Sequence, residues 1–509
     1  MTVRRLAAAA LAMALVVSAA GGQGESAQLG PFLVETLRVA ANGRVLGLHA
    51  EDLDGDGKLD LVAAYATGAA PEPKRALAIW LQKTGRFAES PDQVLDVPKN
   101  AAFVDFVDAD GDGKRALVFA NATGLWARRL VDGKFEREGK KLVAVTGLLA
   151  LPDDEELPFF DVGRDWDGDG KPEILLPVID GVAVFTRQAD GWQRTGTLKL
   201  QPRASYAVKS ELYEPRVRNF AARATFVVPE LQPCDYDGDG QLDLCAVVED
   251  MLQVHKGGAG PSVFSEVAAA RHYLGVRTPD EIRKGAHVHT TVRDLDGDGV
   301  ADLAVSKLAG GLGQMHATIA FYYGKKGGGF DPPAQVMQRE GYAGSLAFAD
   351  LDGDGKLDLV MPHVNVGLAE MARVLIAKKM RIGWEAHQNV GKRQFSVTAA
   401  SVHDLDFTVD YSQLADLDGP FPSVQGDFNG DGKPDFVAAA GPDDLGVWLG
   451  GGKPLIAPQA KAVVRVPPSK WYQVVDLDGD KRADVLLFYR SRETKAREIV
   501  VLHNSGRGW

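Results

Sequence analysis

One acidic string recurs along the chain at a near-constant spacing, and it limits the fold more than any other feature. The pattern Asp-x-Asp-Gly-Asp-Gly-x-x-Asp, or a close variant, begins at eight positions: Asp52, Asp108, Asp165, Asp235, Asp294, Asp350, Asp427 and Asp476. Successive starts lie 56, 57, 70, 59, 56, 77 and 49 residues apart. A repeat of this period is typical of solenoids, propellers and similar arrays. We therefore interpret the chain as eight structural repeats.

The residues between the acidic strings predict strands. Each string is followed by a short apolar run, as at 61–62, 174–176 and 485–487. Roughly thirty residues later, most units carry another apolar run and a turn that pairs glycine with an aromatic residue, as at 76–81 and Gly85-Arg86-Phe87. Short apolar runs bounded by Gly and Asp favour strands over helices. Four antiparallel strands in about 55–60 residues make one blade of a propeller.

These residues resemble the FG-GAP/VCBS repeat family, which includes the β-propeller heads of integrin α chains and many exported bacterial proteins. The resemblance extends over residues 29–509, and Ala440-Gly441-Pro442 is a loose copy of the family's Gly-Ala-Pro signature. It implies an all-β fold: a single β-propeller of four-stranded antiparallel blades with calcium in its acidic loops. Eight strings predict eight blades, and seven is the alternative if one irregular unit is a loop.

The two ends of the chain predict how the ring closes. The last string begins at Asp476, and the sequence to Trp509 is one strand short of a blade. Residues 30–37 read as the missing outer strand, and they precede any acidic string. We therefore expect the N-terminal strand to complete the last blade and remove its free edge.

The acidic strings have the composition of calcium loops. Calcium binds about six to eight oxygen atoms. In the first repeat these would come from the side chains of Asp52, Asp54, Asp56 and Asp60 and the main-chain carbonyl of Lys58. Packing such carboxylates together without a cation would raise their pKa values or unfold the loop. We expect several calcium ions, up to eight, as cofactors.

The other seven repeats supply ligands from the same five places. They are Asp108, Asp110, Asp112 and Lys114; Asp165, Asp167, Asp169, Lys171 and Glu173; Asp235, Asp237, Asp239, Gln241 and Asp243; Asp294, Asp296, Asp298, Val300 and Asp302; Asp350, Asp352, Asp354, Lys356 and Asp358; Asp427, Asn429, Asp431, Lys433 and Asp435; and Asp476, Asp478, Asp480, Arg482 and Asp484. The second repeat has Ala116 at the ninth place, and the eighth has Lys481 at the sixth. Whether calcium binds in these two repeats is therefore left undecided by the sequence.

Other interpretations of the strings fit less well. An EF-hand needs a glutamate at the twelfth place and flanking helices, whereas the twelfth place of the first loop is Ala63 and its flanks predict strands. Magnesium keeps its water and demands a stricter octahedron. The remaining alternative is that Asp and Gly simply form good turns here.

Composition and the N-terminus limit the setting. The net charge of −12 argues against a nucleic-acid partner. The first 20 residues have the pattern of a signal peptide: Arg4 and Arg5 are followed by an apolar run over 6–20 that ends in small residues. We expect no membrane span. The predicted location is therefore secreted, periplasmic or cell-surface. Cys234 and Cys245 bracket the fourth loop. They form either a disulfide or a pair of buried thiols.

Two classes of function remain open. The first is a non-catalytic binding or adhesion module for an extracellular or periplasmic protein or glycan, expected to be monomeric. The second is a polysaccharide lyase, because the resemblance extends to calcium-bearing propellers of that kind. We assign no catalytic residue; the group nominated for a lyase is His287, His289, Lys307 and Tyr322, with His316 nearby. No nucleotide-binding, serine-hydrolase or zinc-protease motif is present.

Two of the longer repeats contain insertions that are further candidates for binding sites. Arg203, Lys209, Arg216, Arg218 and Arg223 form a basic insertion that could hold an acidic polymer, or a solvated surface segment. The acid-rich stretch 403–422 reads as a decayed calcium loop, an extra ion site or a polar insertion.

Overall fold

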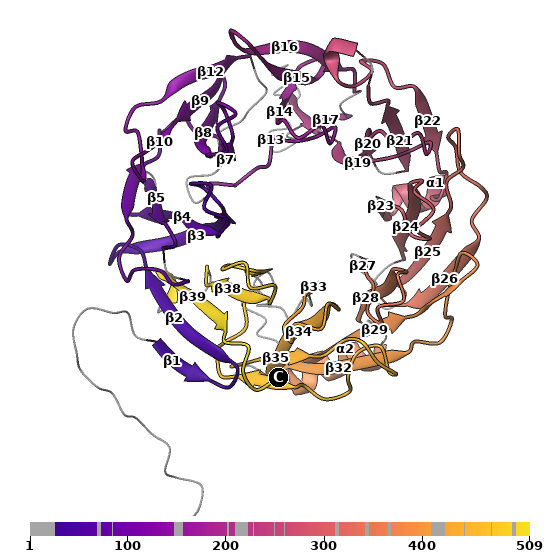
Figure 1. Cartoon of the computed structure of the whole chain (residues 1–509). Coiled ribbons are helices and arrows are strands. Elements are labelled where there is room, and N and C mark those ends of the chain that lie inside the picture. The colour runs from indigo at the N-terminus through magenta and orange to yellow at the C-terminus, as the bar shows by residue number, and fades with distance from the viewer. Residues whose placement is uncertain are drawn as a thin grey trace, which may run out of the picture.

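The protein folds into a ring of β-sheets around a central opening (Figure 1). In this computed structural model the described residues are 26–509 except 69–72, 84, 147–155, 201–202, 209–221, 228, 249, 259, 311–314, 342–345, 365–367, 409–422, 442, 470 and 491–494. Eight antiparallel sheets follow one another round the ring. Each contains one acidic string, so every repeat of the sequence builds one blade.

The first two strands of each blade flank its acidic string. The innermost strands are β3 (Gly43–Glu51), β7 (Phe103–Val107), β13 (Gly163–Arg164), β19 (Glu230–Cys234), β23 (His287–Arg293), β27 (Ala347–Ala349), β33 (Ser423–Gly426) and β37 (Tyr472–Val475). The second strands are β4 (Asp60–Thr67), β8 (Ala116–Asn121), β14 (Glu173–Val178), β20 (Asp243–Val248), β24 (Asp302–Ala309), β28 (Asp358–Val364), β34 (Asp435–Gly441) and β38 (Asp484–Phe488).

The last two strands lie toward the rim. The third strands are β5 (Lys74–Trp80), β9 (Gly124–Arg128), β15 (Gly181–Gln188), β21 (Met251–His255), β25 (His316–Tyr322), β29 (Lys379–His387), β35 (Asp444–Trp448) and β39 (Glu498–Asn504). The outer strands are β6 (Gln93–Asp96), β12 (Lys140–Ala144), β16 (Gly191–Leu198), β22 (Ala270–Tyr273), β26 (Gln335–Glu340), β32 (Ser401–Thr408), β36 (Ala462–Val464) and β2 (Phe32–Arg38).

Smaller elements decorate the blades. They are the hairpins β10 (Leu130–Val131)–β11 (Lys134–Phe135), β17 (Arg203–Val208)–β18 (Ala222–Val227) and β30 (Asn389–Gly391)–β31 (Gln394–Phe395), the helices α1 (Pro279–Arg283) and α2 (Leu368–Ala377), and a 3-10 turn at Gly260–Ser262. Among the described residues, no helix has the length and apolar character needed to span a bilayer.

The N-terminus closes the ring, as the sequence predicts. Strand β2 pairs with β39 along its whole length, from Phe32 opposite Asn504 to Arg38 opposite Glu498. It is thereby the outer strand of the blade whose other three strands come from the C-terminus. A fifth strand, β1 (Ser26–Leu29), adds to the outside of β2. Eight blades are present, and the seven-bladed alternative is excluded.

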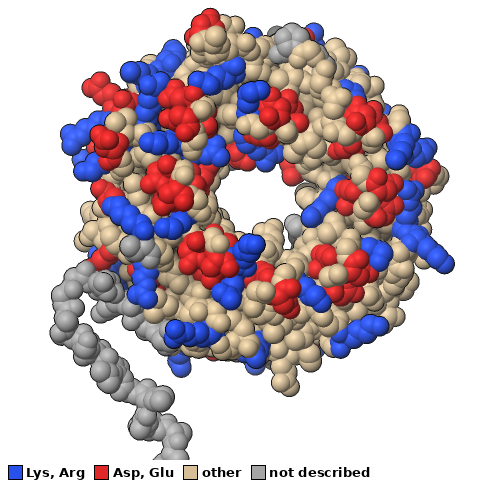
Figure 2. All heavy atoms as spheres, in the orientation of Figure 1, with Lys and Arg blue, Asp and Glu red and all other residues tan. Residues whose placement is uncertain are grey.

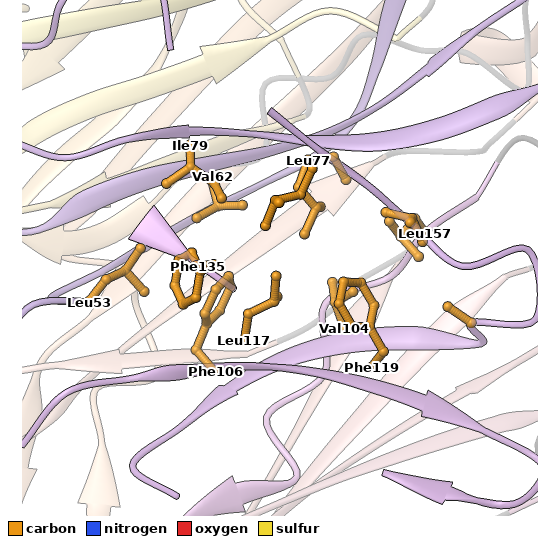
Figure 3. Packing of buried hydrophobic residues seen from close by; sticks show 14 of the residues in the cluster. Leu53, Val62, Leu77, Ile79, Val104, Phe106, Leu117, Phe119, Phe135 and Leu157 are labelled. Atoms are coloured by element: carbon orange, nitrogen blue, oxygen red, sulfur yellow. The ribbon is translucent and has the colours of Figure 1, made fainter. Parts of the chain in front are cut away.

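The hydrophobic core consists of eight clusters, each between two neighbouring blades. Strand β4 shows how the sequence builds them, because alternate residues of a strand point to opposite faces. Val62 lies in one cluster with Phe106 and Phe119 of the next blade (Figure 3), and Ala64 belongs to the same cluster. Leu61 and its alternate neighbours pack toward the last blade. The blades are therefore held together mainly by buried apolar side chains.

Some expectations about particular segments change. Residues 401–408, which include Asp404 and Asp406 of the stretch read as a polar insertion, form outer strand β32, while 409–422 lie outside the described residues. The basic insertion contains the hairpin β17–β18, but its charged side chains also lie outside the description. Cys234 and Cys245 are buried on paired strands, with their Sγ atoms 2.7 Å apart.

Replacing Phe32 tests the closure. Its side chain is fully buried among residues of the last two blades. Phe32→Ala should lower the free energy of unfolding by about 3–5 kcal/mol, because it leaves a cavity at the seam of the ring. Phe160→Ala, at a phenylalanine that is 53% exposed, should cost much less. Equal losses in chemical denaturation would contradict the closure.

A buried carboxyl joins the second and third blades. Asp105 of β7 accepts hydrogen bonds from the backbone N–H groups of Val162 and Gly163, at 2.9 and 3.0 Å. Burial raises its pKa well above the usual range, and the charge of Asp161 adds to the rise. Since the pKa is higher in the folded state than in the unfolded one, ionisation of Asp105 costs stability as pH rises from the ordinary carboxyl range through the folded pKa.

Asp105→Asn should remove this dependence, because the amide does not ionise. Its oxygen can still accept from Val162 and Gly163, while the bond from the N–H of Phe106 to the other carboxylate oxygen is lost at every pH. We expect the melting temperature of the variant, relative to the original protein, to rise between about pH 5 and about pH 8. Thermal unfolding across this range measures the difference. Parallel profiles for the two proteins would contradict the assignment.

Candidate metal centres

The acidic loops all connect the innermost strand of a blade to its second strand. This shared position brings them to one face of the ring, where clusters of Asp and Glu side chains repeat around the central opening (Figure 2). Lys and Arg side chains lie between the clusters. The strings that are far apart in the sequence thus form one ring of acidic sites.

Backbone hydrogen bonds hold the loops in one conformation. In the first loop, Asp52 accepts from the N–H groups of Gly55 and Gly57, at 2.8 and 2.9 Å, and Asp56 accepts from that of Lys58, at 2.9 Å. The same three bonds recur in all eight loops. Gly55 and Gly57 have φ of 80° and 85°, a region that glycine enters without strain.

The ninth residue anchors the loop to the sheet. The Asp60 carboxylate is fully buried and accepts from the N–H of Leu53 inside the loop, at 3.0 Å, and from that of Gln82 beyond the third strand, at 2.7 Å. The equivalent aspartates make the same pair of bonds in the fourth, fifth, sixth, seventh and eighth loops. The ninth carboxylate therefore ties the loop to the third strand.

Burial makes the ninth carboxylates hard to ionise without a cation. It raises the pKa of Asp60, Glu173 and Asp302 to about 7 and that of Asp358 and Asp435 to about 6. The backbone hydrogen bonds oppose the rise, and the like charges of neighbouring loop carboxylates add to it. A bound cation would favour the ionised form, since metal ligands bind deprotonated.

Several loops gather carboxylate oxygens at one point. Groups of three with oxygens all within 4.8 Å of one another are Asp52, Asp54 and Asp60; Asp165, Asp167 and Glu173; Asp294, Asp296 and Asp302; Asp350, Asp352 and Asp358; and, in the fourth loop, Asp235, Asp237 and Asp239. Four of these groups combine the first, third and ninth places. Oxygen-only donors of this kind suit a hard cation such as calcium.

The two irregular loops keep the same backbone. In the second, Asp108 and Asp112 make the usual backbone bonds although Ala116 replaces the ninth carboxylate. In the eighth, Lys481 adopts φ of 67° where the other loops have glycine, and its N–H still donates to Asp476, at 2.8 Å. The departures therefore change the donor set and not the loop conformation.

Loops of neighbouring blades also bond to each other. The N–H of Arg115 in the second loop donates to the carbonyl of Leu53 in the first, at 3.0 Å. Leu59 donates to Leu477 of the eighth loop, and Ala301 of the fifth loop to Asp235 of the fourth, at 3.0 and 2.7 Å. Order in one loop is thus linked to the contact between blades.

Sequence reasoning missed a side chain that faces the loop from the third strand. Lys256 places its ammonium nitrogen 2.7 Å from Asp237, 3.1 Å from Asp239 and 3.1 Å from Asp243. In the sixth blade Gln388 donates to Asp352 at 2.8 Å. These residues lie outside the acidic strings, so the string pattern could not reveal them.

The group nominated for a lyase does not converge. His287 and His289 are exposed on β23, opposite Leu308 and Ser306, whereas Lys307 lies opposite Val288. Because alternate residues point to opposite faces, Lys307 is on the other face of the sheet from both histidines. It is paired there with Glu281 at 2.9 Å. Tyr322 and His316 share the face of Lys307.

A cavity of about 550 Å³ lies between the first and last blades. Leu48 and His49 of β3 line one side, and Trp471 and Gln473 line the other. The segment that crosses toward the third blade contributes Phe159, which stacks on His49. The cavity thus offers aromatic rings beside polar groups.

Comparison of sequences identifies FG-GAP-like repeats in residues 52–119, 294–361 and 427–487. These segments begin at the first aspartates of the first, fifth and seventh acidic strings. No curated protein matches the chain in sequence.

Comparison of structures finds other proteins of low sequence identity. A lectin from Agrocybe aegerita that recognises non-reducing terminal N-acetylglucosamine is 18% identical with a TM-score of 0.43, covering 92% of this chain and 99% of its own. The V. cholerae biofilm matrix protein Bap1 is 14% identical with a TM-score of 0.31, covering 92% and 88%. The exotype rhamnogalacturonan lyase YesX is 12% identical with a TM-score of 0.26, covering 93% and 76%.

The ninth carboxylate can be tested in the first loop. Asp60→Asn turns an amide N–H toward a backbone N–H, so one hydrogen bond is lost along with a ligand charge. We expect a loss of about 1–3 kcal/mol in unfolding free energy and a smaller change in melting temperature on adding a chelator. Asp132→Asn, at an exposed turn with φ of 50°, is the matched control and should change neither. Equal behaviour of the two variants would contradict the role of Asp60.

Proposed function

We propose that this FG-GAP-repeat propeller is an exported calcium-binding protein that binds a protein or a glycan on a calcium-ordered face and catalyses no reaction. The observation that carries the proposal is the carboxylate cluster repeated from blade to blade on one face of a closed ring.

Calcium fits the donor set better than other common ions. The first, third and ninth places supply oxygen ligands alone, and the fifth-place aspartate and seventh-place carbonyl are the further ligands that we propose. Neither a thiolate nor an imidazole belongs to the triads of the first, third, fifth and sixth loops, which disfavours zinc and copper. Bound calcium would supply positive charge to buried carboxylates whose pKa values are raised by burial.

Calcium bound in the acidic loops would order the face of the ring that carries them, and an ordered face is suited to binding a partner. In six blades the ninth carboxylate bonds the loop to a residue just beyond the third strand or at its end, and several loops are bonded to the loop of a neighbouring blade. Ions in these loops would therefore fix many side chains at once. A surface that is ordered before binding loses less conformational entropy when a ligand arrives.

The proposed setting is outside the cytoplasm. The sequence of residues 1–20 has the pattern of a secretory signal, although it lies outside the described residues. We propose that the protein is secreted, periplasmic or held at the cell surface, and that it acts as a monomer.

A glycan array with and without calcium tests the function. We expect a defined set of glycans to bind in calcium, with a signal at least about tenfold lower after EGTA treatment. Trp471→Ala should reduce binding if the ligand enters the cavity between the first and last blades, whereas Trp192→Ala, in the third blade, should not. Binding that ignores calcium would contradict the proposal.

The same samples distinguish a lyase from a binding module. A lyase would release unsaturated sugars from uronate polymers, which absorb ultraviolet light. We expect no such absorbance, because His287 and His289 lie on the opposite face of the blade from Lys307. Its appearance would replace the binding function with an enzymatic one.

A further inference from the structure

In every blade one residue, near the end of the third strand or directly after it, lies opposite the ninth residue of the acidic string. It is one step beyond the last pair of the register between the second and third strands. Since residues directly opposite each other share a face, its side chain lies beside the ninth carboxylate. Round the ring it is occupied by Leu81, Arg129, Thr186, Lys256, Tyr323, Gln388, Leu449 and His503.

Contacts in three blades show that this position reaches into the loop. Gln388 donates to the third-place Asp352 at 2.8 Å, and Arg129 donates to the third-place Asp110 at 2.8 Å. Lys256 goes further than either, because its ammonium group contacts the third, fifth and ninth carboxylates of its loop together.

Lys256 is held in this place rather than extended into solvent. Its side chain is 24% exposed, and the three carboxylates that it contacts match the three N–H donors of an ammonium group. The neighbouring Gly257 N–H donates to the buried Asp243 at 2.8 Å, which fixes the backbone beneath the lysine. In the first and seventh blades leucine occupies the same position and brings no charge.

We propose that the Lys256 ammonium is the resident cation of the fourth loop, so that this loop takes no calcium while the sixth loop, with the uncharged Gln388 at the same position, does. The inference rests on the proposed function, since it divides the loops into those that depend on the ion and those that do not. A calcium ion among Asp235, Asp237 and Asp239 would lie close to the ammonium, and like charges repel at such distances. The fourth blade would then stay ordered when calcium is removed.

The number of calcium ions bound per chain tests this inference. After exchange into calcium and removal of the free ion, elemental analysis should find one more ion in Lys256→Met than in the original protein, because methionine keeps the apolar stem and removes the charge. The reverse substitution is Gln388→Lys, at the same position of the sixth blade, where the side chain already reaches Asp352. It should bind one ion fewer.

Lys74→Met is the matched control, at an exposed lysine that begins the third strand of the first blade, at the opposite end of that strand from the acidic loop. Its ion count should equal that of the original protein. Circular dichroism in calcium confirms that each variant is folded, and Gln388→Lys keeps the test decisive if Lys256→Met fails to fold.

The outcomes separate this inference from the proposed function. Several ions in the original protein and unchanged counts in Lys256→Met and Gln388→Lys would overturn the role of Lys256 and leave calcium binding intact. No ions in the original protein or in any variant would overturn the proposed function and this inference with it. One ion gained and one lost would support both.

Discussion

The repulsion among carboxylates that the chain gathers in each blade is the constraint on which the structure depends. Backbone N–H groups offset part of it: the first, fifth and ninth carboxylates of the first loop all accept such bonds. Burial of Asp60 still raises its pKa to about 7, so the backbone hydrogen bonds alone do not offset the cost of burying the ionised carboxylate. A cation would balance the remainder, and the proposed calcium and the proposed role of the Lys256 ammonium are two ways to provide one.

The position of the loops makes this local balance matter to the whole ring. The ninth residue begins the second strand and is bonded to a residue beyond the third, so a disordered loop would loosen three strands of its blade. Bonds such as Arg115 to Leu53 carry the effect to the neighbouring blade. The apolar clusters between blades and the pairing of β2 with β39 supply the rest of the closure.

The sequence was sufficient for the architecture because the repeats carry the same signal eight times. The number of blades follows from the number of strings, and the strands next to Asp60 and Asp243 follow from the apolar runs beside them. The closing strand near Phe32 follows from a last unit that is one strand short of a blade. Lys256 could not be found in this way. The residue opposite the ninth place comes 13 positions after Asp243 but 30 after Asp358, since the hairpins differ in length, and only the register shows that Lys256 and Gln388 are equivalent.

If a divalent cation stabilises the acidic loops, the melting temperature depends on the ion present, and its measurement in calcium, in magnesium and in excess EGTA decides the matter. The melting temperature should be many degrees higher in calcium than in EGTA, with magnesium giving little of the increase. Superimposable melting curves in calcium and EGTA would contradict a stabilising role for the cation.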